Sequence, residues 1–84
     1  MKGYRMRGWR RVAWRRRVIV NLRSGGAIVG VLRNARGGVL ELAQAMYHPP
    51  GGTPVALDGS AIIDTANVDF AQVLPSVTPH TVGE

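Results

Sequence analysis

Alternating apolar and polar residues dominate the chain from residue 18 onward. Val18, Val20 and Leu22 recur with a period of two, as on one face of a β-strand. Ile28 and Leu32 continue at matching parity after a Gly-Gly turn. Because each strand then buries only one face, the pattern predicts a small barrel or sandwich.

Five short strands are expected, at the spacing typical of a small closed or nearly closed sheet. They span residues 18–22, 27–33, 39–47, 55–63 and 68–74. Residues 48–54 form a loop, because adjacent prolines and a glycine pair suit neither a helix nor a ladder. Gly59 is expected to bend or bulge the fourth strand, and residues 64–67 to form the turn before the fifth.

Alternation alone leaves the facing of two strands open. In the third strand, either Val39 or Leu40 accompanies Leu42 in the interior, depending on the register. In the fifth strand, Phe70 faces either inward or outward.

Residues 1–17 form a basic arm that contains interleaved aromatic residues. As a helix, the arm places Trp9, Val12 and Ala13 on one stripe, which would lie on the open end of a barrel. As a strand, Val12 and Trp14 would share the parity of the next strand. We favour a short helix. The chain then divides into the arm (1–17), the barrel (18–74) and a flexible, aperiodic tail (75–84).

Length and composition narrow the class of protein. At 84 residues the chain is one domain, near the size at which a single core leaves only a few kcal/mol of net stability. It has no cysteine, so a disulfide framework and a thiolate metal site are excluded. No apolar run approaches the ~20 residues of a membrane span, and none suits a secretory signal. We expect a cytoplasmic protein without an integral membrane segment.

The net charge of +6 is unevenly distributed. Every basic residue lies at or before Arg36, and every acidic residue lies after it. Lys2 is the only lysine. This bias reflects either the bidentate grip of guanidinium groups on phosphates or a GC-rich coding genome. The chain therefore joins a polycationic arm to a mildly acidic body.

Two segments resemble the two motifs of the Sm-like (LSm/Hfq-type) superfamily. The first motif resembles V-x-V-x-L-x-x-G-x-x-x-x-G-x-L, and its positions are held by Val18, Val20, Leu22, Gly25, Gly30 and Leu32. The second resembles G-x-x-x-I-R-G-x-x-I-x-x-I-x-x-L, and its structural positions are held by Gly59, Ile63, Val68, Ala71 and Leu74. The resemblance implies an all-β fold: a five-stranded, strongly bent antiparallel barrel, preceded here by a short basic helix or arm.

The resemblance also implies a homo-oligomeric ring of five to seven subunits, with strand four of one subunit paired to strand five of the next. The strand edges support such pairing, because they lack the lysines and inward charges that normally block it. The expected interface residues are Ala61, Ile62, Ile63, Val68, Asp69 and Phe70. The alternative is a monomer whose arm or tail covers these edges.

The uridine site of the family does not carry over to this chain. The family's aspartate is replaced by Arg36, its asparagine position falls near Val39, and its Arg-Gly pair is replaced by Asp64-Thr65. A ring of Asp64 carboxylates around a pore would repel phosphates. We therefore do not expect uridine recognition of the family type.

RNA or DNA is instead expected to bind to the basic arm. Arginines contact phosphates independently of sequence, and each aromatic side chain that stacks on a base contributes roughly 1–3 kcal/mol. The candidate residues are Arg5, Arg7, Trp9, Arg10, Arg11, Trp14, Arg15, Arg16, Arg17 and Arg36, with Tyr4 as a third stacking side chain. In the plainer interpretation, the arginines are a solvated charge run and the tryptophans pack on the barrel.

Other function classes were weighed against this hypothesis. One is a structural or assembly component of a larger particle such as a phage virion, located in the host cytoplasm or the virion, with the arm on acidic protein or packaged DNA. Another is binding to a membrane surface, although Gly8 interrupts the short apolar face. An enzyme is not expected, because the chain has no cysteine nucleophile, metal-ligand spacing or phosphate-binding loop. No cofactor or metal is expected either.

Overall fold

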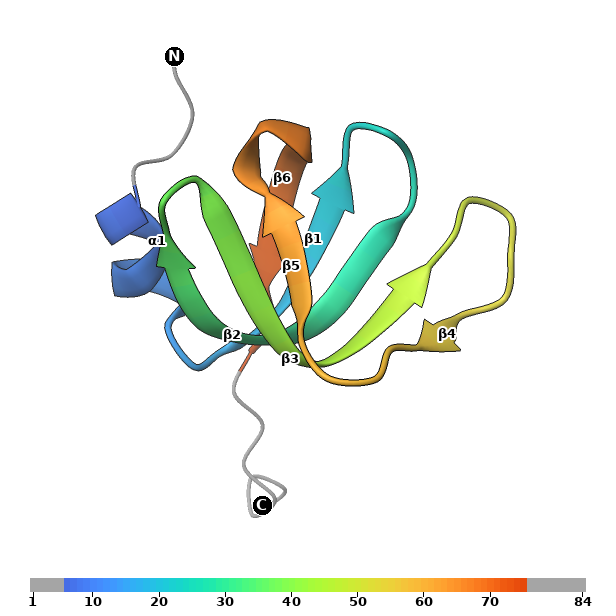
Figure 1. The fold of residues 1–84 in the computed structure, drawn as a ribbon, viewed down its shortest axis with the longest axis horizontal. Helices are drawn as coiled ribbons and strands as arrows, with labels where there is room; N and C mark the ends of the chain where they lie inside the picture. Colours follow the sequence, from blue (N-terminus) through green and yellow to red (C-terminus); the bar gives the residue numbers. More distant parts are fainter. Residues whose placement is uncertain (1–5, 76–84) are drawn as a thin grey trace.

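The computed structural model describes residues 6–75, which form a curled antiparallel sheet with one short helix beside it (Figure 1). In chain order the elements are α1 (Met6–Ala13), β1 (Arg17–Leu22), β2 (Ala27–Arg36), β3 (Val39–His48), β4 (Val55–Ala56), β5 (Ala61–Asp64), the 3₁₀ turn η1 (Thr65–Asn67) and β6 (Val68–Val73). Within residues 6–75, no helix is long and apolar enough to cross a membrane.

The sheet follows the strand order β4-β3-β2-β1-β6, and β5 also pairs with β3. β5 lies against residues 39–42, in the first part of β3, and β4 lies against residues 46–47, near its end. β3 therefore bends between its two partners. β5 and β6 follow each other along the chain but are not paired with each other, so the barrel remains open between them.

The predicted all-β, strongly bent antiparallel fold is confirmed, with one change in the number of strands. The predicted fourth strand is two strands, β4 and β5, separated by residues 57–60. Gly59 lies in this break with φ of +72°, a conformation that glycine adopts without steric cost. The expected bend at Gly59 thus interrupts the ladder instead of only curving it.

The pairing of β2 with β3 is interrupted by a β-bulge next to Gly30. Gln44 and Ala45 on β3 together oppose Gly30 on β2. A Cβ atom added to Gly30 would lie 2.8 Å from the carbonyl oxygen of Ala43. Only glycine therefore allows the two strands to approach this closely.

The core lies on the concave face of the sheet. Its fully buried large side chains are Val18, Val20, Leu32, Leu40 and Leu42. Leu40 rather than Val39 therefore faces inward in β3, and the exposed Phe70 faces outward in β6. These two side chains settle which residues of the third and fifth predicted strands face the core.

Helix α1 packs onto the sheet as part of the same core. Trp9 and Ala13 belong to the buried cluster, and the helix contacts β2. The predicted helix is confirmed, but the predicted stripe is only partly correct. Val12 is 61% exposed, and it lines a hollow beside β6 rather than the barrel interior.

Candidate nucleic-acid interface

Most of the arginines whose side chains are described are exposed. Exposed guanidinium side chains belong to Arg11, Arg15, Arg17, Arg23, Arg33 and Arg36. Among the arginines whose side chains are described, which are Arg11, Arg15, Arg16, Arg17, Arg23, Arg33 and Arg36, none forms an ion pair with a described carboxylate. Because unpaired guanidinium groups remain available to phosphates, this distribution favours an anionic partner.

Arg16 differs from these arginines because it has a structural role. Its Nη2 donates a hydrogen bond of 2.8 Å to the carbonyl oxygen of Leu74. The backbone N–H of Leu74 in turn donates to the carbonyl of Arg17 at 2.8 Å. Arg16 thus holds the end of β6 beside the start of β1, so its predicted phosphate contact competes with this bond.

The two tryptophans of the arm have different surroundings. Trp9 is 7% exposed and packs in the core, as in the plainer of the two sequence interpretations, so stacking on a base would require it to leave the core. Trp14 follows the end of α1 and is 42% exposed. The helical stripe predicted from the sequence includes Trp9 but not Trp14, and this periodicity is the signal that separates them.

Several predicted contacts fall outside this description. Tyr4 and Arg5 precede the described residues, and nothing is described of the side chains of Arg7 and Arg10. The predicted tail is described only at Pro75.

A groove on the outer face of the sheet brings together polar side chains from the segment after α1, from β2 and from β3. It is lined by Trp14, Arg15, Val31, Arg33, Ala43 and Gln44, and has a volume of about 510 Å³. Val31 and Arg33 alternate with the buried Leu32, which places them on the convex side of β2. The sequence prediction missed Arg33 and Gln44. The only available signal was the parity of Arg33, which is opposite to that of Leu32.

Arg15 and Gln44, two of the polar residues that line this groove, both have left-handed backbone conformations. Arg15 has φ of 60° and Gln44 has φ of 51°, and among residues 6–75 no other non-glycine residue has positive φ. Arg15 lies where the chain leaves α1, a position at which left-handed residues commonly end helices. Its N–H donates to the carbonyl of Leu32 at 2.9 Å. Gln44 lies in the bulge opposite Gly30.

The positions that replace the family's uridine site meet at the turn between β2 and β3. Arg36 pairs with Val39, and Val39 pairs on its other side with Asp64. The carboxylate of Asp64 accepts a hydrogen bond of 2.9 Å from the N–H of Ala66 and thereby caps η1. This confirms the turn predicted at 64–67 and gives Asp64 a local structural role. Arg36 is exposed at this turn.

The predicted interface residues divide into two sets, one buried in the core and one exposed on the outer face. Ala61, Ile63 and Val68 are buried in the core of their own subunit, so they can take part in the predicted edge pairing through their backbone groups but not through their side chains. Ile62, Asp69 and Phe70 are exposed. In β5, alternation with a period of two places Ile62 on the opposite side from its neighbours. In β6, the register shift opposite Asn21 and Leu22 breaks the alternation, so Phe70 lies outward although Val68 lies inward.

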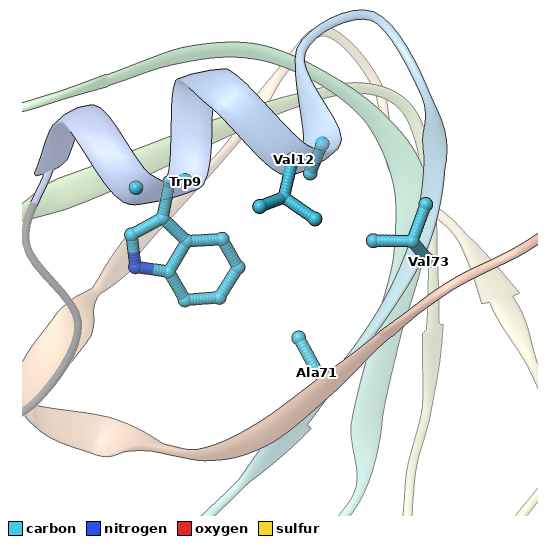
Figure 2. Close-up of a pocket in the computed structure, with 6 residues that line it drawn as sticks. Trp9, Val12, Ala71 and Val73 are labelled. Atoms are coloured by element: carbon cyan, nitrogen blue, oxygen red, sulfur yellow. The ribbon is translucent and has the colours of Figure 1, made fainter.

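An apolar hollow borders the unpaired edge of β6 (Figure 2). Trp9 and Val12 of α1 form one wall, and Ala71 and Val73 of β6 form the other. Its volume is about 120 Å³. The hollow adds apolar surface beside the strand edge on which a further strand would pair.

Comparison with known proteins identifies two similar solved structures. A heptameric archaeal Sm protein, whose structure was described for its implications for the eukaryotic snRNP core, superposes with a TM-score of 0.66. It is 26% identical over 77% of this chain and 94% of its own. The SmAP1 heptamer of P. aerophilum has a TM-score of 0.70 and 22% identity, covering 89% of this chain and 100% of its own. No protein-family model and no curated protein sequence matches significantly.

Proposed function

Because this chain belongs to the Sm-like superfamily, we propose that it is a non-enzymatic, ring-forming module that binds nucleic acid through the arginines of its N-terminal segment. The proposal has two parts, which are assembly through the sheet edges and binding through the exposed charges. Each part is supported by different residues and can be tested separately.

The unpaired edges of β5 and β6 support assembly. Their inward side chains are committed to the core, so a second copy would add backbone hydrogen bonds along the edge without disturbing the fold. On the outer face, Ile62 of β5 is 63% exposed and Phe70 of β6 is 50% exposed. When β5 of one copy pairs with β6 of the next, these two side chains lie on the same face and cover each other.

Such a contact generates a ring rather than a closed dimer. It joins two different edges of the same subunit, so it is heterologous and repeats until a rotation closes it. The two solved Sm proteins to which this chain is similar are heptamers. We therefore propose a ring within the range of five to seven copies that the family resemblance implies.

The observation that carries the nucleic-acid part is the set of unpaired arginines at the start of the barrel. Arg11, Arg15 and Arg17 are exposed, and no carboxylate in the described segment pairs with them. All acidic residues follow Arg36 in sequence. Attraction to phosphates supplies affinity without base recognition, which agrees with the replacement of the family's uridine-binding residues.

The test is the salt dependence of binding to a labelled single-stranded 15-mer, measured with the full-length protein. Deleting the arm is unsuitable, because it removes Trp9 and Ala13 from the core. The charges are removed instead in the triple variant Arg11→Gln, Arg15→Gln, Arg17→Gln. At about 0.7 per phosphate contact on single strands, the variant lowers the slope of log affinity against log salt by about two.

The control for this test is Arg23→Gln, which removes an exposed charge from the turn after β1. An affinity for the wild-type protein that does not change between low and moderate salt would exclude the nucleic-acid part. A ring that forms but binds no oligonucleotide would instead favour the structural or assembly role, with the arm on an acidic protein.

A further inference from the structure

Arg16 lies at the junction of three elements. Its backbone N–H donates to the carbonyl oxygen of Ala13, the last residue of α1, at 2.9 Å. Its own carbonyl oxygen accepts from the N–H of Leu32 in β2 at 3.0 Å. Its side chain reaches the third element, because Nη2 donates to the carbonyl oxygen of Leu74, the residue after β6, at 2.8 Å. Arg16 therefore links the end of α1 with the end of β6.

The bond from Arg16 to Leu74 sets this arginine apart within the basic segment. The bond is partly buried, and it joins residues that are 58 positions apart in the chain. Arg15 and Arg17, on either side of Arg16, are exposed. A hydrogen bond from a charged donor is stronger than one between neutral groups, and a buried carbonyl left without its donor is unfavourable. The Arg16–Leu74 bond is therefore a structural contact between distant segments.

Strand β6 depends on this bond because it is paired on one side only. Within residues 6–75, β6 pairs with β1 as far as Val73, and its other edge has no partner strand. Two hydrogen bonds hold the next residue, Leu74. Its N–H donates to the carbonyl of Arg17 at 2.8 Å, and its carbonyl accepts from Arg16. The Arg16–Leu74 bond thus keeps the end of β6 in the sheet.

The two elements that Arg16 links also form the two walls of the apolar hollow. Trp9 and Val12 of α1 face Ala71 and Val73 of β6 across it (Figure 2). Because Arg16 ties the end of α1 to the end of β6, it holds these walls together beside the unpaired edge. The hollow is continuous with that edge, so a strand that pairs with β6 would cover both.

An edge that is already ordered favours assembly. Where the end of β6 is disordered in the free subunit, it must become ordered when a second copy pairs with it, and the lost conformational entropy weakens the contact. A bond that orders β6 before assembly removes this cost. Every contact in a closed ring uses the same edge, so loss of the bond weakens all the contacts together.

We propose that Arg16 is a positioning residue for assembly, whose bond to Leu74 holds the edge of β6 and the adjoining hollow in place for β5 of a second copy. This inference rests on the proposed function and deepens it, because it assigns one arginine of the basic segment to the contact between copies. Arg16 thereby serves assembly, whereas its exposed neighbours Arg15 and Arg17 serve nucleic-acid binding.

The deciding variant is Arg16→Gln, because glutamine is shorter and uncharged and cannot replace the guanidinium at Leu74. Its matched control is Arg23→Gln, which removes the same charge from an exposed position in the turn after β1. Sedimentation of fluorescently labelled full-length protein, diluted from micromolar to nanomolar concentrations, gives the concentration at which the rings dissociate. Arg16→Gln is expected to raise this concentration about tenfold or more, and Arg23→Gln less than about twofold.

A second measurement separates positioning of the edge from support of the fold. The variant Ile62→Arg, which places a charge on the edge of β5, supplies the isolated subunit. Adding Arg16→Gln to it is expected to speed hydrogen exchange of the Leu74 amide about tenfold, because the end of β6 then opens more often. The melting temperature is expected to change no more than with Arg23→Gln.

Two results would overturn this inference and leave the proposed function standing. One is that rings of Arg16→Gln dissociate at the same concentrations as rings of Arg23→Gln, or do not dissociate. The other is that the melting temperature falls while exchange at Leu74 is unchanged, because Arg16 would then support only the fold of the subunit. A wild-type protein that is monomeric at every concentration would overturn the proposed assembly as well.

Discussion

At the scale of single residues, role follows from the face that a side chain occupies rather than from its type. Trp9 and Trp14 are both tryptophans in an arginine-rich arm, and composition assigns both to base stacking. The helix directs Trp9 into the core, whereas Trp14 lies beyond the last helical residue and beside the groove. The same distinction separates the hydrogen-bonded Arg16 from the exposed Arg15.

Alanine substitutions of the two tryptophans should therefore have opposite consequences. Trp9→Ala is expected to lower the free energy of unfolding by about 3–5 kcal/mol, because it leaves a cavity among the core side chains. Trp14→Ala is expected to change it by less than about 1 kcal/mol, because the side chain is only partly buried. Urea denaturation followed by circular dichroism measures both values. Equal losses would contradict the assignment of Trp9 to the core and Trp14 to the surface.

At the scale of elements, the edges of β5 and β6 are the distinctive feature. They are neighbours in sequence, joined by η1, yet within residues 6–75 each pairs with a different strand on only one side. Exposed apolar residues on both edges, together with the hollow between α1 and β6, leave apolar surface that a partner strand would cover.

A charge on either edge should block assembly without unfolding the subunit. Ile62→Arg and Phe70→Arg each place a guanidinium where the neighbouring copy would bring an apolar side chain, so both are expected to yield monomers in analytical ultracentrifugation. Val55→Arg is the control, because Val55 is similarly exposed, at 51%, but belongs to β4. The circular dichroism spectrum should stay unchanged in all three. Assembly of Ile62→Arg to the wild-type size would contradict the edge contact.

Local sequence patterns predicted most of the elements, although the predicted fourth strand is two strands, but they did not predict the groove. The strands, the bend at Gly59 and the turn at residues 64–67 are local features that the sequence encodes with a period of two or with turn residues. The groove instead depends on the pairing of β2 with β3 across the bulge, which brings Arg33 near Gln44. Nothing in the residue type of Gln44 signals its left-handed conformation.

At the scale of the whole molecule, the uneven distribution of charge along the chain parallels the two parts of the proposed function, which are nucleic-acid binding and assembly. The basic half provides α1, β1 and β2, together with both arginines of the groove. The acidic half provides β5 and β6, whose unpaired edges would join the copies. A ring of the proposed kind would repeat the basic half of the subunit around its circumference, so that several weak contacts to one strand would act together.

The mass of the full-length protein in solution tests the central claim most directly. Sedimentation equilibrium or multi-angle light scattering, in moderate salt and without nucleic acid, is expected to give a single species of five to seven 9.1-kDa chains, independent of concentration across the micromolar range. A stable 9.1-kDa monomer across the same range would contradict the account, because the edges of β5 and β6 would then have no partner strand to bind.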